Sequence, residues 1–336
     1  MRNIVIIACL CISVAGGLYT VFREPSSSMR SIPDISKITV PIEIQRLEKV
    51  LFGLTSQEDI RVFLRDHVLF STQFLGLSSH KDEDALVARL HAMIHDTNIR
   101  ALYQEVQRVF EDLSVIQQQF AEAFRYIRYY YPDFKIPQLA TFITGMDTDV
   151  YLSEELIIIG LDFFMGENAK FRPIALPEYI LSAYQPDYIV PKTIHLLSQQ
   201  FSKRNNADQT LLADMLHHGK HYYFAQAMLP KVAKNVILAY TKEQLTDVEQ
   251  HQDIVWGHFI DHELLYVTNH LTKKNYLNEN PFTSEIGQRC PGRIGRWLGW
   301  EIVKSYMQKN TEVSLPTLMH HTDAQALLAK SRYRPK

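Results

Sequence analysis

Residues 209–230 (QTLLADMLHHGKHYYFAQAMLP) constrain the fold of this chain more than any other stretch, because they predict its best long helix. His217 and His221 stand four residues apart there, so a helix places both imidazoles on one face. The first two zinc ligands of an H-E-x-x-H metallopeptidase are held at this spacing. Position 218 is histidine instead of glutamate, so the motif lacks the group that would take a proton from zinc-bound water.

Composition allows a large core and gives no sign of a nucleic-acid partner. The 336 residues are 46% apolar, which suits two domains or one larger helical domain. Lysine and arginine (35) nearly balance aspartate and glutamate (37), without a run of basic residues. Cys9 and Cys11 lie in the apolar N-terminal segment, which leaves Cys290 alone in the body. An intrachain disulfide or a cysteine metal cluster is therefore not expected in the body.

The N-terminus predicts export. Arg2 precedes residues 4–22, an uncharged apolar segment of the kind found in export signals and membrane anchors. Three forms stay open: an uncleaved anchor, cleavage after residues 15–17, and a lipoprotein signal in which Cys9 is lipidated. Only five apolar residues precede Cys9, fewer than the ~7–15 of a usual signal. In every form we expect the body to lie outside the cytoplasm. Arg2 agrees with this orientation, because positively charged residues beside a membrane segment usually stay on the cytoplasmic side.

The apolar pattern that follows is helical up to residue 132. Residues 44–51 carry a helical stripe, and residues 98–131 have apolar residues in steps of three and four. The second pattern predicts one long amphipathic helix that Pro132 ends. Residues 139–164 are instead rich in β-formers around a turn-like stretch, which predicts a small sheet of two to four strands.

Helical patterns return in the C-terminal half. A short helix is predicted over residues 193–201. Thr241 and Gln244 form a capping-box signature, which begins a helical region that continues to residue 267.

A glycine stripe marks the last long helix. Gly292, Gly295 and Gly299 would share one helix face, and each glycine costs about 1 kcal/mol relative to alanine. Three of them on one face predict the close approach of another helix, and the histidine-bearing helix is the expected partner. Trp297 and Trp300 are expected in the core.

A series of sequence blocks extends over nearly the whole body: residues 156–166 (LIIIGLDFFMG), 177–180 (PEYI), 291–295 (PGRIG), 302–307 (IVKSYM) and 331–336 (SRYRPK), together with Gly219, Lys220, Tyr223, Gly292, Arg293, Gly295, Gly299 and Trp300. These blocks, in this order, resemble the GldB family, the gliding-motility lipoproteins of Bacteroidetes. The resemblance implies an envelope lipoprotein that is needed for gliding motility, is associated with the type IX secretion machinery, and has no established catalytic activity. The position of Cys9 departs from the family's lipoprotein signal.

A second, distant resemblance covers the C-terminal half. The order of a small sheet, the histidine-bearing helix and a G-x-x-x-G-W-x-I-V-x-x-Y helix is similar to that of predicted zinc peptidases of zincin type. A third zinc ligand would come from residues 261–263, which makes His217, His221 and Glu263 the candidate zinc set. Alternatively, two histidines at this spacing are incidental in a chain with 14 histidines. A lysine is by default solvated, but Lys220 could also be a buried ion-pair partner or part of a docking surface, and the adjacent Gly219 favours a structural use.

These observations predict an α+β, mainly α protein: a helical domain with a small β-sheet, for which the second resemblance implies a degenerate zincin-like scaffold. Residues 1–22 are a signal or anchor and residues 23–39 a linker. Residues 40–336 form a single GldB-like domain, helical over 40–132 and with a small sheet plus helices over 133–336.

We expect an exported, membrane-anchored protein of the cell envelope whose body faces the periplasm. It would be a non-catalytic assembly or interaction component of the gliding and type IX secretion machinery, with envelope proteins as partners and without a cofactor. The alternative is a zinc-dependent peptidase of altered zincin type. A third possibility is a general envelope factor in a species that does not glide.

Overall fold

The computed structural model describes residues 31–174 and 176–335. From Ile32 onward the chain forms one compact unit. The predicted anchor, residues 1–22, and the candidate lipidation site Cys9 lie outside the described residues. Among the described residues, none of the helices combines the length and the apolar character that crossing a membrane requires.

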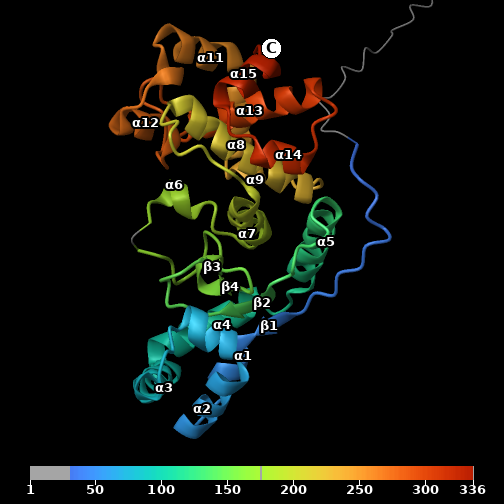
Figure 1. Cartoon of the computed structure of the whole chain (residues 1–336). Coiled ribbons are helices and arrows are strands. Elements are labelled where there is room, and N and C mark those ends of the chain that lie inside the picture. The colour runs from blue at the N-terminus through green and yellow to red at the C-terminus, as the bar shows by residue number, and fades with distance from the viewer. Residues whose placement is uncertain (1–30, 175, 336) are drawn as a thin grey trace, which may run out of the picture. The chain divides into compact units, whose positions relative to one another are not determined.

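The fold is mainly α-helical with one small sheet, as the sequence predicted (Figure 1). The sheet has four strands in the order β1-β2-β4-β3: β1 (Ile44–Arg46), β2 (Gln138–Phe142), β3 (Val150–Leu152) and β4 (Leu156–Gly160). The β1–β2 and β2–β4 pairs are parallel, and β3–β4 is antiparallel. All five residues of β4 are buried, which is typical of a strand covered on both faces.

Strand β1 corrects the helical prediction for residues 44–51. Ile44 pairs in register with Leu139 of β2, and the helix begins only at Leu47. A strand of three residues is shorter than one period of a helical stripe, so the apolar spacing alone does not distinguish the two structures. Long-range pairing with β2 decides the conformation here.

The N-terminal part is helical, as predicted, but its long helix is broken. The helices are α1 (Leu47–Phe52), α2 (Gln57–Asp66), α3 (His80–His95), α4 (Thr97–Val109) and α5 (Ser114–Tyr130), with a π-helical turn at Phe70–Phe74. The prediction of one helix over residues 98–131 is therefore wrong. Asp112 accepts hydrogen bonds from the Ser114 backbone N–H (2.8 Å) and hydroxyl (2.6 Å), which favours a turn at this point. Apolar side chains continue in phase across the turn and conceal it.

The C-terminal part contains ten helices among the described residues. They are α6 (Glu178–Leu181), α7 (Ile189–Leu197), α8 (Leu211–Met228), α9 (Lys234–Leu238), α10 (Lys242–Gln250), α11 (Gln252–Asp261), α12 (His270–Leu277), α13 (Ile294–Lys309), α14 (Leu315–His320) and α15 (Ala324–Ser331). Short 3-10 turns occupy Leu161–Phe163, Pro186–Tyr188, Ser198–Phe201 and Leu264–Tyr266. The predicted capping box of Thr241 and Gln244 is confirmed at the start of α10.

Helices α8 and α13 pack directly against each other (Figure 1). An added Cβ at Gly219 would lie 2.4 Å from the Gly299 carbonyl carbon, and one at Gly299 would lie 1.9 Å from the Met215 carbonyl oxygen. The predicted close approach of the two helices is thus confirmed. Trp297 and Trp300 are fully buried, also as predicted.

Gly292 does not belong to the helical stripe. Arg293 precedes α13 with a left-handed φ of 60°, so the helix begins at Ile294. A Cβ at Gly292 would lie 2.1 Å from the Asn280 carbonyl oxygen, so this glycine also allows a close backbone contact, but with a different segment.

Candidate functional site

A cavity of about 450 Å³ lies beside α8 and α13, within the size range of small-molecule sites. Its walls come from α6, α7, α8, α9 and the start of α13. We call it the basic cavity, because its charged and imidazole side chains are Lys192, His195, Arg204, His217, His218, His221, Glu279, Arg293 and Arg296. Four tyrosines also line it: Tyr179, Tyr184, Tyr188 and Tyr222.

His217 and His221 meet in this cavity, with their Nε2 atoms 3.2 Å apart. The Nδ1 atom of His221 lies 2.6 Å from the Ser198 hydroxyl oxygen, and that hydroxyl donates to the His195 carbonyl at 2.5 Å. Because the hydroxyl has a single hydrogen, His221 must donate from Nδ1, which leaves its Nε2 as an acceptor. His217 then donates from Nε2, and its own Nδ1 becomes an acceptor.

All four imidazoles of the basic cavity are uncharged at neutral pH. Burial lowers the pKa of His217 to about 4, with Lys220 adding to the effect. Burial likewise lowers the pKa of His195 to about 3 and that of His221 to about 2. The pKa of His218 also falls well below its usual value, for the same reason. A buried cationic imidazole would lose its hydration without gaining a carboxylate partner.

Ion pairs hold the cations of the cavity wall. Lys192 pairs with Asp149 at 2.7 Å, and Arg204 pairs with Asp214 at 2.5 Å. Lys273, from outside the wall, also binds Asp214, at 2.7 Å.

Glu279 is shared by two arginines. Its Oε2 atom accepts from Arg293 Nε at 2.9 Å, and its Oε1 atom lies 3.7 Å from Arg296 Nη1. Arg293 also donates to the carbonyls of Leu238 and Ala239, at 2.8 and 2.9 Å, which ties the start of α13 to the end of α9. Arg293 is therefore held by three protein acceptors, whereas among the described residues the Arg296 side chain has only the longer contact with Glu279.

Glu263 does not join the histidine pair. It follows α11 with a left-handed φ of 54° and lines a different pocket, together with Trp256 and Tyr266. Within the part of the chain that the structure describes, no three His, Cys, Asp or Glu side chains are arranged to hold a metal. The structure therefore brings together two of the three candidate zinc ligands and places the third elsewhere.

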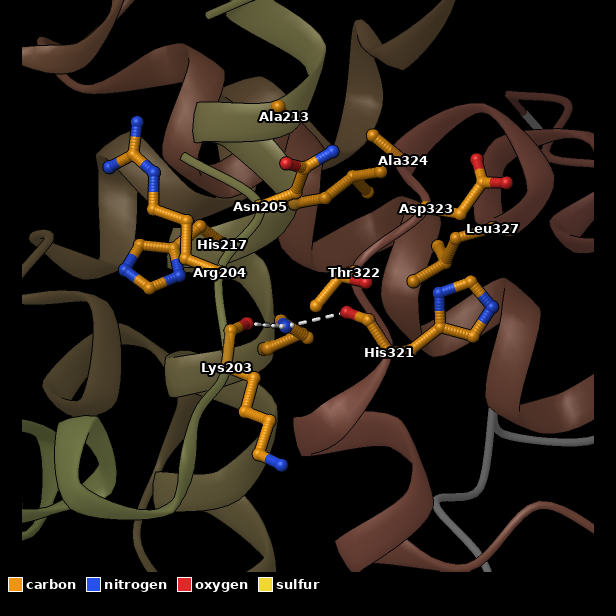
Figure 2. Close-up of a pocket in the computed structure, with 12 residues that line it drawn as sticks. Lys203, Arg204, Asn205, Ala213, His217, His321, Thr322, Asp323, Ala324 and Leu327 are labelled. Carbon is orange, nitrogen blue, oxygen red and sulfur yellow. Dashed lines mark hydrogen bonds between the residues drawn. The ribbon is translucent and has the colours of Figure 1, made fainter. Parts of the chain in front are cut away.

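Lys220 lies under a small neighbouring hollow and is almost fully buried. Its ammonium donates to the carbonyls of Lys203 (3.0 Å), Met319 (3.2 Å) and His321 (2.9 Å). Figure 2 shows the Lys203 and His321 oxygens converging on this nitrogen. Burial lowers the pKa of Lys220 to about 8, which keeps it charged at pH 7. The ion-pair alternative for Lys220 is wrong, because backbone oxygens and no carboxylate of the described residues hold it.

Sequence reasoning singled out part of this site and missed the rest. Lys192, His195, Arg204 and Arg296 line the cavity but belong to no motif that it recognised. The one available signal was spacing: Lys192 and His195 are three residues apart in a helical segment, so they lie on one side of a helical turn. The Tyr223 side chain is buried within α8, so this family residue belongs to the packed interior.

The family model described as gliding motility protein GldB matches residues 28–335, which is nearly the whole chain. Neither the curated proteins nor the solved structures contain a match to this sequence.

Proposed function

Since this chain belongs to the GldB family of gliding motility proteins, we propose that it acts in the cell envelope as a non-catalytic assembly or interaction component of the gliding and type IX secretion machinery. It would be exported and held at a membrane through residues 1–22, by lipidation of Cys9 or by an uncleaved anchor, with its body in the periplasm. Its partners would be envelope proteins of the same machinery.

The non-catalytic part of this proposal rests on the lack of a free carboxylate among the described residues that line the basic cavity. Glu279 is the only carboxylate among the described lining residues, and Arg293 holds it at 2.9 Å. Position 218 has an imidazole whose low pKa makes it a weak base. Proton abstraction at neutral pH requires a base with a pKa close to that pH, in reach of the substrate. The cavity wall offers binding groups and no carboxylate free for this role.

A zinc-dependent peptidase of altered zincin type is the second candidate, and one observation favours it. Zinc–nitrogen bonds of about 2.0–2.1 Å allow two ligand nitrogens to approach to the 3.2 Å seen between His217 and His221. The bond from His221 to Ser198 also fixes the tautomer that a ligand would need. A catalytic site needs a third protein ligand as well, and the described residues do not supply it. The donor set therefore does not fit a catalytic zinc centre.

Complementation of a deletion strain tests the proposed function. We expect deletion to abolish colony spreading and type IX secretion, and a His217→Ala/His221→Ala variant to restore both as well as the natural protein does. Immunoblots of membrane fractions would show that each protein is present at equal amounts. The metal content of the purified full-length protein should stay below one zinc per chain.

Two outcomes would contradict the proposal. Stoichiometric zinc that is lost in the double variant, together with lost spreading at normal protein level, would favour the peptidase. Normal spreading and secretion after deletion would favour the third possibility, a general envelope factor.

A further inference from the structure

The basic cavity has more positive than negative charge. Of the charged groups that line it or belong to its ion pairs, five are cationic (Lys192, Arg204, Lys273, Arg293 and Arg296) and three are anionic (Asp149, Asp214 and Glu279). The imidazoles are neutral and do not change this balance. Arg293 and Arg296 also lie at the start of α13, where the helix dipole adds partial positive charge. An anion with two negative charges would neutralise this surplus.

Three residues of the cavity wall also carry polar atoms that the described protein leaves without partners. The Nε of Arg296 is buried and has no acceptor within the described residues. The Nδ1 atoms of His217 and His195 are buried and likewise have no hydrogen-bond partner there. A buried polar atom without a partner is costly, so native proteins rarely retain one that nothing satisfies.

The unpartnered atoms are chemically complementary. Arg296 Nε is a donor and calls for an anionic acceptor. His217 Nδ1 is an acceptor, because His217 donates from Nε2 to His221. A matching ligand would therefore combine an anionic group with an O–H or N–H donor.

We propose that the basic cavity is a binding site for a phosphate monoester, either a free phosphorylated small molecule or the exposed headgroup of a phospholipid. Near neutral pH such a group carries between one and two negative charges, close to the charge surplus of the wall. Its oxygens accept from Arg296 and Arg204, since guanidinium groups bind phosphate through paired N–H donors. A hydroxyl of the ligand, or the phosphate proton, donates to His217. The site does not depend on the proposed role in motility.

Calorimetric titration of the detergent-solubilised full chain tests this site. The soluble probes are inorganic phosphate and glycerol 3-phosphate, and sulfate is the matched anion that carries no proton donor. We expect both phosphates to bind, and sulfate to bind about 3- to 10-fold more weakly because it leaves His217 without a donor. Equal affinities for sulfate and phosphate would overturn the role of His217.

Two variants locate the binding. Arg296→Gln should weaken phosphate binding about 10- to 100-fold, while Glu279 keeps its bond to Arg293 and so does not become an isolated buried charge. Ala183→Leu should weaken binding by narrowing the cavity without altering any charge. Arg65→Gln on α2, where the side chain is exposed, is the matched control and should bind as the natural protein does. Thermal melting of each variant verifies folding.

Mixed micelles distinguish the two sources of the phosphate monoester. Phosphatidic acid is titrated in dodecyl maltoside micelles, with phosphatidylcholine as the control lipid. Binding of phosphatidic acid but not of glycerol 3-phosphate, weakened in both variants, would assign the site to a lipid headgroup. Binding of both would support a site for the free monoester. No binding of any phosphate probe, or binding unaffected by either variant, would overturn the proposal. Because binding is measured on purified protein, this failure is distinguishable from a failure of the motility role.

Discussion

Lys220 holds together segments that are distant in the sequence. Its ammonium has no carboxylate partner among the described residues and donates to backbone oxygens before α8 and around the end of α14. Hydrogen bonds from a charged donor are stronger than those between neutral groups, which offsets part of the cost of burying the charge. The side chain thereby fixes the C-terminal segment against α8.

Replacement of Lys220 by methionine should destabilise the protein. Methionine has a similar length but no donor, so the carbonyls of Lys203 and His321 would lose the bonds that they accept from it. We expect the free energy of unfolding at pH 7 to fall by about 2–3 kcal/mol, measured by urea denaturation. Lys274→Met on α12, where the lysine is exposed, is the control. Equal stability of the two variants would show that the three carbonyl contacts contribute nothing.

The buried histidines should make stability depend on pH. Their pKa values in the folded protein lie below the ordinary value of 6.5, so the unfolded chain takes up protons first as the pH falls. These shifts leave the free energy of unfolding unchanged above about pH 6.5 and lower it as the pH falls from 6.5 towards the folded pKa values of about 4 (His217), 3 (His195) and 2 (His221). Each histidine contributes a slope of about 1.4 kcal/mol per pH unit within this window.

Urea denaturation between pH 7.5 and 5 measures this slope. His195→Gln should reduce it by the equivalent of one proton, because the variant removes one group that titrates only after unfolding. His320→Gln, at an exposed position, should leave it unchanged. The same slope in the natural protein and in His195→Gln would contradict the neutral, buried state of this imidazole.

The contact between α8 and α13 is set by glycines. At Gly219 and Gly299 the backbones approach so closely that a methyl group on either would overlap backbone atoms of the other helix. Backbone atoms cannot rotate away as a side chain does, so the helices themselves would have to separate. This contact also positions the cavity, since α8 carries three of its four histidines and the start of α13 carries two of its arginines.

Gly299→Ala should lower the free energy of unfolding by about 1–3 kcal/mol, although alanine favours the helix. Gly257→Ala in α11 is the matched control, because no atom lies within 4 Å of an added Cβ there. The control should be neutral or up to about 1 kcal/mol more stable. Thermal and urea denaturation of both variants would reveal the difference, and a stabilised Gly299→Ala variant would refute the tight contact.

At the scale of the whole molecule, the sheet and the cavity belong to the same compact unit. Helix α7 contacts α8 and also β3, and α5 contacts both α7 and α8. These two helices connect the N-terminal helices and the sheet to the part of the fold that carries the cavity. A ligand or partner at the cavity would therefore meet a wall that is built mostly from these packed helices.

Local patterns in the sequence were sufficient to predict most of the helices, the sheet and one helix–helix contact. Apolar periodicity predicted most helices, β-branched residues predicted the sheet, and the glycines of α13 predicted its close contact with α8. The blocks around Gly219 and Arg293 indicated the family. These features depend on neighbouring residues or on one helix face, so the linear sequence carries them.

Tertiary structure alone decided the rest. The turn before Ser114 and the strand at Ile44 depend on local hydrogen bonds and long-range pairing that override the apolar period. The surroundings of Lys220 consist of backbone oxygens, which every residue has, so no sequence pattern could indicate them. The basic cavity draws its polar side chains from α7, α8, α13 and the loops between helices, and only folding shows that His217 and His221 line the same cavity as Arg296, whereas Glu263 lines another. Sequence determines which groups the chain has, whereas packing determines which of them face one another.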